Sequence, residues 1–235
     1  MRTRPSASEG GPERRFGSGG ERGRLSQGAF RLARGDAAPL QQSPTTCGSA
    51  CLTVARMLAN PPFADWVIRG DPNTNHGAAA PPHSADERFA AYEQVVARRT
   101  NGLVGPNGRL QPPWPRALGT PPWGARHEIE YGASPPGTRY ALVWTRLSGI
   151  RRLGRLYDHM RGEVHAGRPV LLYVGNGWLP RHVVLALPGT ADGRDDLDVY
   201  EPSIGRVVPL SRDAFVTRRL ELAGWDVPWC LVSPR

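Results

Sequence analysis

The sequence contains no lysine, and all 30 of its basic residues are arginine. A phosphate-binding P-loop needs its lysine and Schiff-base chemistry needs a lysine amine, so both mechanisms are excluded. The 235-residue chain carries a formal charge of +9. Its many Arg, Ala, Gly and Pro residues also suit a GC-rich genome. The charge therefore does not by itself predict nucleic-acid binding.

Cysteine is scarce, and the count of three is odd. This argues against a disulfide scaffold and fits a reducing compartment. No cysteine spacing indicates zinc, and we expect no metal and no cofactor. No apolar run approaches the length of a membrane span, and the arginine-containing N-terminus lacks the apolar segment of a secretory signal. We expect a soluble, cytoplasmic protein.

Apolar residues are also sparse at the N-terminus. Residues 1–38 are rich in Gly, Arg, Ser and Glu and show no hydrophobic period. Such a segment buries too little apolar surface to offset its ordering entropy, so we predict a disordered tail. Removal of residues 1–36 should then leave folding intact. Residues 39–235 are predicted to form one domain.

The order of predicted elements defines the fold class. Helical patterns come first, at about 47–59 and 84–99, with a loop-rich stretch over 61–83. Short apolar runs separated by turn residues follow and predict strands at 169–174, 181–187, 197–200 and 206–210. Helices followed by an antiparallel meander indicate an α+β fold.

A cysteine stands where a loop turns into a helix. Thr45 and Thr46 are N-cap candidates, and Cys47 follows in the first helical turn. Unpaired N–H groups and the helix dipole favour the thiolate there, which is the nucleophilic form. Cys51, one turn later, lies on the apolar face and is predicted to belong to the core.

A histidine and two acids occur at the ends of predicted strands. His182 begins one strand after a Gly-containing loop, and Glu201 ends the next strand at a turn. Strands joined as neighbours would bring the two side chains together. Asp198 is the alternative acid, on the opposite face of a regular strand. With Cys47, these residues predict a Cys–His–carboxylate site.

Three blocks of sequence, TTCGSACL, RHVVLAL and YEPSIG, resemble motifs of the double-glycine leader peptidases, papain-like cysteine proteases that process bacteriocin precursors. The resemblance implies Cys47 as nucleophile, His182 as base, Glu201 as the acid and Gln41, six residues before the cysteine, as oxyanion donor. It also implies a papain-like fold in which the helix carrying the cysteine packs on a C-terminal antiparallel sheet. Residues 60–168 fall outside the motifs and look like a family-specific insertion.

The chain departs from this family pattern in two ways. The acid is Glu instead of Asp, and the membrane and ATP-binding parts of many members are absent. The resemblance thus implies a stand-alone, leader peptidase-like thiol hydrolase that cuts a peptide or amide bond of a peptide or protein substrate through an acyl-enzyme. The alternatives are a transglutaminase-like acyl transferase with the same triad, a non-catalytic peptide-binding module, and an arginine-dependent polyanion binder. Nucleic acid and membrane are not expected partners.

Overall fold

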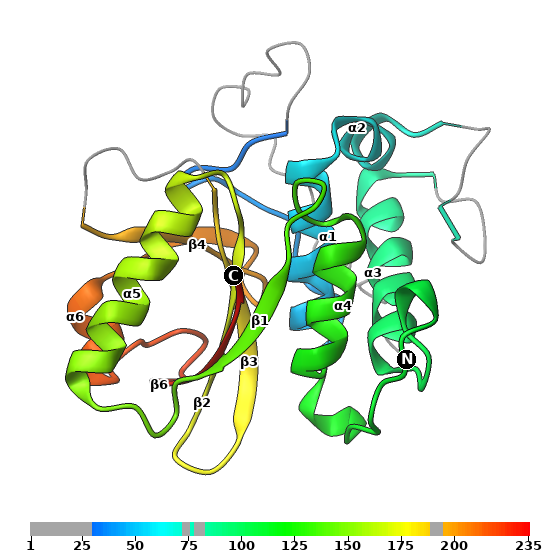
Figure 1. Ribbon diagram of the computed structural model, residues 1–235. Helices are drawn as coiled ribbons and strands as arrows, with labels where there is room; N and C mark the ends of the chain where they lie inside the picture. Colours follow the sequence, from blue (N-terminus) through cyan, green and yellow to red (C-terminus); the bar gives the residue numbers. More distant parts are fainter. Residues whose placement is uncertain (1–29, 72–75, 78–82, 189–194) are drawn as a thin grey trace, which may run out of the picture.

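The structure is a computed structural model, and it describes residues 30–71, 76–77, 83–188 and 195–235. A six-stranded sheet forms the middle layer, and helices cover both of its faces (Figure 1). No helix in the described residues is both long and apolar enough to cross a membrane.

The helices fall into two groups. Four helices cover one face of the sheet: α1 (Cys47–Ala59), α2 (Pro61–Arg69), α3 (Ala85–Asn101) and α4 (Pro122–Gly132). Two helices cover the other: α5 (Ile150–His165) and α6 (Arg212–Thr217). Each face has its own core of buried side chains, because the strands carry apolar residues on both sides.

The sheet has the order β1-β6-β2-β3-β4-β5, and every pairing within it is antiparallel. The strands are β1 (Tyr140–Trp144), β2 (Val170–Gly175), β3 (Pro180–Ala186), β4 (Leu197–Glu201), β5 (Arg206–Leu210) and β6 (Val227–Pro234). β2 to β5 follow one another as the predicted meander. β6, the last strand in the chain, lies between β1 and β2.

Helix α1 is the central helix of its layer. Ten of its thirteen residues are buried, and it packs against β3 and against α2, α3 and α4. The predicted fold class is therefore confirmed: an α+β fold in which the helix carrying Cys47 packs on an antiparallel sheet.

Helix α2 was not predicted, because the sequence pattern assigns residues 61–83 to loops. Pro61 and Pro62 stop α1 but also occupy the first two positions of α2, where a missing N–H costs nothing. Asn60 is the C-cap residue of α1 and the N-cap residue of α2. As the N-cap residue, its side chain accepts a hydrogen bond from the Phe63 N–H (3.1 Å). Residues 72–75 and 78–82 lie outside the described residues.

Residues 30–38 correct the prediction of a disordered tail. Leu32 is buried, Ala37 forms a β-bridge with Arg206, and the Ala38 N–H donates to the Gly205 carbonyl (2.9 Å). This segment adds backbone pairing to the outer edge of β5, which its composition did not predict. Residues 1–29 lie outside the described residues.

Residues 60–168, predicted as an insertion, contribute to both layers of helices and to the sheet. α3 and α4 pack on α1, and β1 pairs with β6. This stretch is thus part of the main body of the domain, because it completes one edge of the sheet and covers the helix that carries Cys47.

Candidate active site

Cys47 is the first residue of α1 and is 3% exposed. Thr46 occupies the N-cap position, but its side chain makes no capping hydrogen bond. The Thr46 hydroxyl instead donates to the Ser43 carbonyl (3.0 Å) and accepts from the Ser43 N–H (3.0 Å). The N–H groups of the first helical turn therefore receive no capping oxygen from the Thr46 side chain.

His182 lies on β3 next to an irregularity in the sheet. Its partner on β2 is Val174, and the register shifts between Val174 and Gly175. Such bulges bend a strand locally and often redirect a functional side chain. The imidazole is 5% exposed.

Glu201, the last residue of β4, contacts the imidazole of His182. Its Oε1 lies 2.6 Å from Nε2 of His182, and the side chain is buried. This distance agrees with the prediction that neighbouring strands bring His182 and Glu201 together. Because Nε2 faces Glu201, the other ring nitrogen, Nδ1, is the one available to the thiol.

Hydrogen bonds and charges around His182 oppose the effect of its burial. Burial alone lowers the pKa of the imidazole, but hydrogen bonds with Cys47 and Glu201, together with their charges, raise it to about 9. An imidazole with this pKa carries a proton at neutral pH. The arrangement therefore favours the imidazolium form of His182.

Ser203 is a site residue that the sequence analysis missed. Its N–H (3.0 Å) and its hydroxyl (2.8 Å) both donate to Oε1 of Glu201, which fixes the carboxylate toward His182. The signal was present in the sequence as a serine two residues after the acid, a spacing typical of side chains that bond the following turn.

Asp198, the alternative acid, is engaged elsewhere. Its buried carboxylate accepts a hydrogen bond from Nε of Arg34 (2.7 Å) and pairs with Nη2 of the same arginine (2.6 Å). Arg34 belongs to the segment next to β5, far from the thiol in sequence. Asp198 thus neutralises a structural arginine, and Glu201 is the acid that contacts His182.

Gln41 lies in the loop before α1 and is half-buried. Its backbone N–H donates to the Pro202 carbonyl (2.9 Å), which ties this loop to the turn after Glu201. Its Nε2 donates to the Ser43 carbonyl (2.9 Å), and an amide nitrogen has a second hydrogen that can serve an oxyanion. The neighbouring Gln42 is exposed and donates to the Leu40 carbonyl (3.2 Å).

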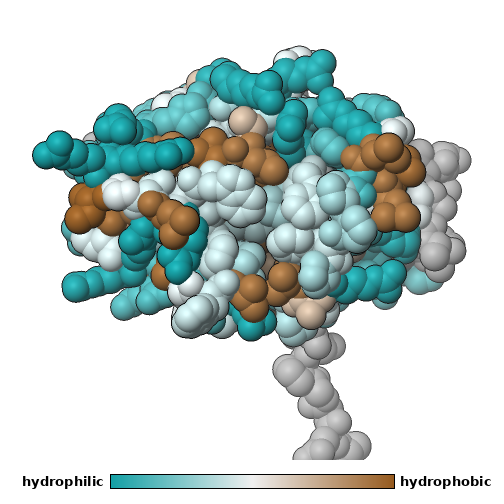
Figure 2. Space-filling model, turned by 60° about the horizontal axis from the view of Figure 1, so that its bottom comes forward, coloured by the Kyte–Doolittle hydropathy of each residue, from teal (hydrophilic) through white to brown (hydrophobic). Residues whose placement is uncertain are grey.

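The β2–β3 hairpin leads directly into His182 and exposes large apolar side chains. Trp178 is 86% exposed, and Leu147, on the nearby β1–α5 loop, is 90% exposed. Arg146 joins the two loops, since it donates to the Gly177 carbonyl and its guanidinium lies over the Trp229 ring. Figure 2 shows that apolar residues on the lower face form several separate patches.

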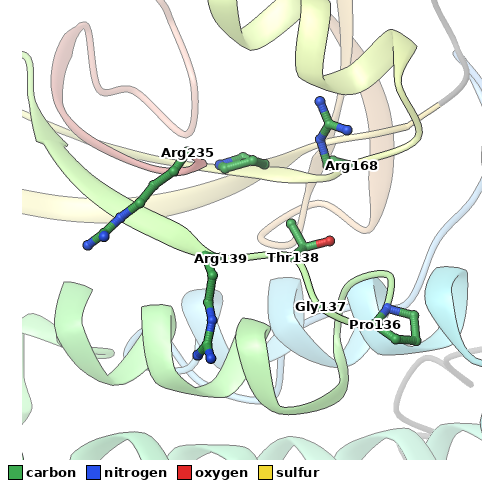
Figure 3. A pocket seen from close by; sticks show the side chains of 7 residues that line it. Pro136, Gly137, Thr138, Arg139, Arg168 and Arg235 are labelled. Atoms are coloured by element: carbon green, nitrogen blue, oxygen red, sulfur yellow. The ribbon is translucent and has the colours of Figure 1, made fainter.

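A hollow of about 470 Å³ lies at the other end of β2 from His182. Arg139, Arg168 and Arg235 line it, but their side chains point away from one another (Figure 3). Arg168 pairs with Glu163 and Arg139 with Glu130. These arginines do not converge on a common point, as an anion site would require. Among the described residues, no group of three His, Cys, Asp or Glu side chains could hold a metal ion.

No protein-family model matches the chain, and no curated protein matches it. Among solved structures, it is similar to the Pseudomonas avirulence protein AvrPphB. The two chains are 13% identical, the match covers 85% of this chain and 96% of that one, and the TM-score is 0.45. This match does not support the leader peptidase family in particular, so that resemblance stays a prediction.

Proposed function

We propose that this protein is a cysteine hydrolase that cleaves a peptide or amide bond of a peptide or protein through an acyl-enzyme. The observation that carries the proposal is the position of His182, whose Nε2 lies 2.6 Å from Oε1 of Glu201 and whose pKa is also raised by the nearby Cys47. A nucleophile, a base and a group that orients the base form the triad arrangement of nucleophilic catalysis by a thiol.

Each residue has a role in the proposed reaction. His182 takes the thiol proton, and the Cys47 sulfur attacks the carbonyl carbon of the substrate. Glu201 keeps the ring in place and stabilises the imidazolium. The carbonyl electron pair moves to oxygen, and the Cys47 N–H and the Gln41 amide donate to that oxyanion.

The second half of the reaction uses the same groups. The intermediate collapses and expels the amine, which takes the proton from His182, and an acyl group remains on sulfur. Water then attacks this thioester with His182 as base and releases the acid. The near-complete burial of the Cys47 and His182 side chains strengthens their charge interactions, because little water screens them.

Selective alkylation tests this proposal. All three cysteines are almost fully buried (Cys47 3%, Cys51 0% and Cys230 1% exposed), so exposure alone predicts no large difference between them. Burial raises the pKa of the Cys51 and Cys230 thiols, which disfavours their thiolates. With iodoacetamide at pH 7 below one equivalent, we expect Cys47 to react at least about tenfold faster than the other two.

His182→Ala is the matched control for this experiment. It removes the base and leaves the three cysteines in place, so peptide mapping should show that the preference for Cys47 disappears. Equal labelling of all three thiols in the wild type, or no labelling before denaturation, would contradict the proposal.

A further inference from the structure

A buried carboxyl group lies behind the loop that precedes the nucleophile. Glu93, in the middle of α3, is 0% exposed. Its Oε1 accepts a hydrogen bond from the Gln42 N–H (3.1 Å), and the Thr46 side chain lies close enough to affect the pKa of this carboxyl. Its Oε2 is buried with no hydrogen-bond partner among the described residues. A buried carboxyl without a paired cation is costly, so packing alone does not explain it.

The two partners of Glu93 lie at the two ends of one loop. Gln42 follows Gln41, the proposed side-chain donor to the oxyanion. Thr46 precedes Cys47, whose N–H is the proposed backbone donor. Figure 1 shows α3 beside α1, the helix that this loop enters. Glu93 therefore contacts the loop next to both donors. Among the hydrogen bonds of the described residues, none joins Glu93 to the imidazole of His182.

The other ionisable groups that face Glu93 are neutral near pH 7. They are Cys51 of α1 and Tyr200 of β4, and burial raises the pKa of both. No arginine pairs with Glu93 among the ion pairs of the described residues. Burial raises the pKa of Glu93 to about 7, although the bonds from Thr46 and Gln42 partly oppose this. Its charge therefore changes within the neutral range.

We propose that Glu93 is a positioning residue for the oxyanion-binding loop, and that its carboxylate holds the Gln42 N–H so that the donors at Gln41 and Cys47 converge on the substrate oxygen. This inference rests on the proposed function and deepens it. An ionised carboxylate accepts this bond more strongly than the neutral acid does. Stabilisation of the oxyanion should therefore increase as the pH rises through 7, independently of the state of the nucleophile.

Two small reagents separate the nucleophile from the oxyanion donors. With iodoacetamide, the Cys47 sulfur displaces iodide in one step, and no oxyanion forms. With p-nitrophenyl acetate, sulfur attacks the carbonyl carbon and the electron pair moves to oxygen. The tetrahedral intermediate then expels p-nitrophenolate and leaves an acetyl group on sulfur, which water releases as acetate. Because the chain has no lysine, no side-chain amine competes for this ester.

The test compares the two rates for Glu93→Gln, which keeps the shape of the side chain and removes its charge. At pH 8 we expect acylation by p-nitrophenyl acetate to fall about tenfold, less than the roughly 10²–10³-fold loss of a whole oxyanion donor. Alkylation should stay within about twofold, since the nucleophile and base are unchanged. The ratio of acylation to alkylation should rise with pH through 7 in the wild type and become flat in the variant.

Thr46→Val perturbs the same loop, since it removes the hydroxyl beside the Glu93 carboxyl together with its two hydrogen bonds to Ser43, and it should also reduce acylation selectively. Gln94→Ala, an exposed neighbour on α3, is the control and should change neither rate. Cys47→Ala gives the background for both reagents. Equal loss of both rates in Glu93→Gln and Thr46→Val, or no loss of either, would overturn the role of Glu93. A wild type in which Cys47 shows no preference with iodoacetamide would instead overturn the proposed function, and this inference with it.

Discussion

The two acids of β4 have the same charge and lie three residues apart, yet their partners differ. Glu201 contacts His182 and Ser203, whereas Asp198 pairs with Arg34. The partner of each carboxylate decides its role: one supports the base of the proposed site, and the other compensates a charge in the N-terminal segment.

Substitution of each acid by its amide should therefore have different effects. Glu201→Gln should lower the pKa of His182 from about 9 by roughly one unit or more, because the amide lacks the charge that favours the imidazolium. Acylation by p-nitrophenyl acetate should fall roughly 10²-fold. Titration of the imidazole by NMR and a rate assay check both values.

Asp198→Asn is the comparison for that substitution. It should leave the imidazole titration and the acylation rate unchanged and lower the thermal stability, because Arg34 loses its close ion pair with Asp198 and keeps the longer contact with Asp196 (3.8 Å). A larger loss of acylation in Asp198→Asn than in Glu201→Gln would show that the wrong acid has been assigned.

The residues of the proposed site differ in how far the sequence could predict them. His182 and Glu201 lie at ends of consecutive strands, and local patterns define such ends well. Glu93 lies in a helix between Tyr92 and Val95, and the period of the apolar residues does not show that its carboxyl turns inward. Its contacts are with a loop 51 residues earlier in the chain, so only the tertiary fold brings them together.

At the scale of elements, the segment 30–41 connects the site to the edge of the sheet. Besides its pairing with β5, it accepts a hydrogen bond from the Tyr200 hydroxyl at the Pro39 carbonyl (2.5 Å) and reaches Pro202 through Gln41. Both ends of the Glu201 turn are thus held by this segment, of which residues 30–38 were predicted to be disordered. Composition underestimates order here because backbone hydrogen bonds, which any residue can make, supply most of the contacts.

Truncation should locate the true start of the folded domain. Deletion of residues 1–36 removes Arg34 and leaves Asp198 buried without a cation, so we expect the free energy of unfolding to fall by about 2–4 kcal/mol. This revises the expectation from composition that such a deletion is harmless. Urea denaturation of the two chains measures the difference.

Deletion of residues 1–29 is the matched control and should leave the unfolding midpoint within error of the full chain. If both deletions had the same small effect, the pairing of residues 30–36 with β4 and β5 would not contribute to stability.

At the scale of the whole molecule, two buried groups link stability to pH in the same direction. The pKa of Glu93 is raised from 4.5 to about 7 by burial. The pKa of His182 is raised from 6.5 to about 9 by its two partners, against the effect of burial. In both cases the folded state binds the proton more tightly than the unfolded state, so stability falls as the pH rises.

The prediction is a loss of stability in two windows, at pH 4.5–7 for Glu93 and at pH 6.5–9 for His182, each of about 3 kcal/mol. Urea denaturation between pH 5 and pH 9 measures it. Glu93→Gln should abolish the fall in the lower window and keep that in the upper one. An unchanged lower window in this variant would show that Glu93 does not titrate there.

The position of β6 has a consequence for synthesis of the protein on the ribosome. β6 follows the other five strands of this sheet in the sequence, yet it lies inside the sheet and joins β1 to β2. Such long-range pairing forms late, after the separated parts of the chain are present. Cys47 is therefore translated long before the sheet that holds His182 and Glu201 can close. Until β6 has been translated, the nascent chain carries the thiol beside an incomplete sheet, so the sheet around the proposed site is completed only after that point.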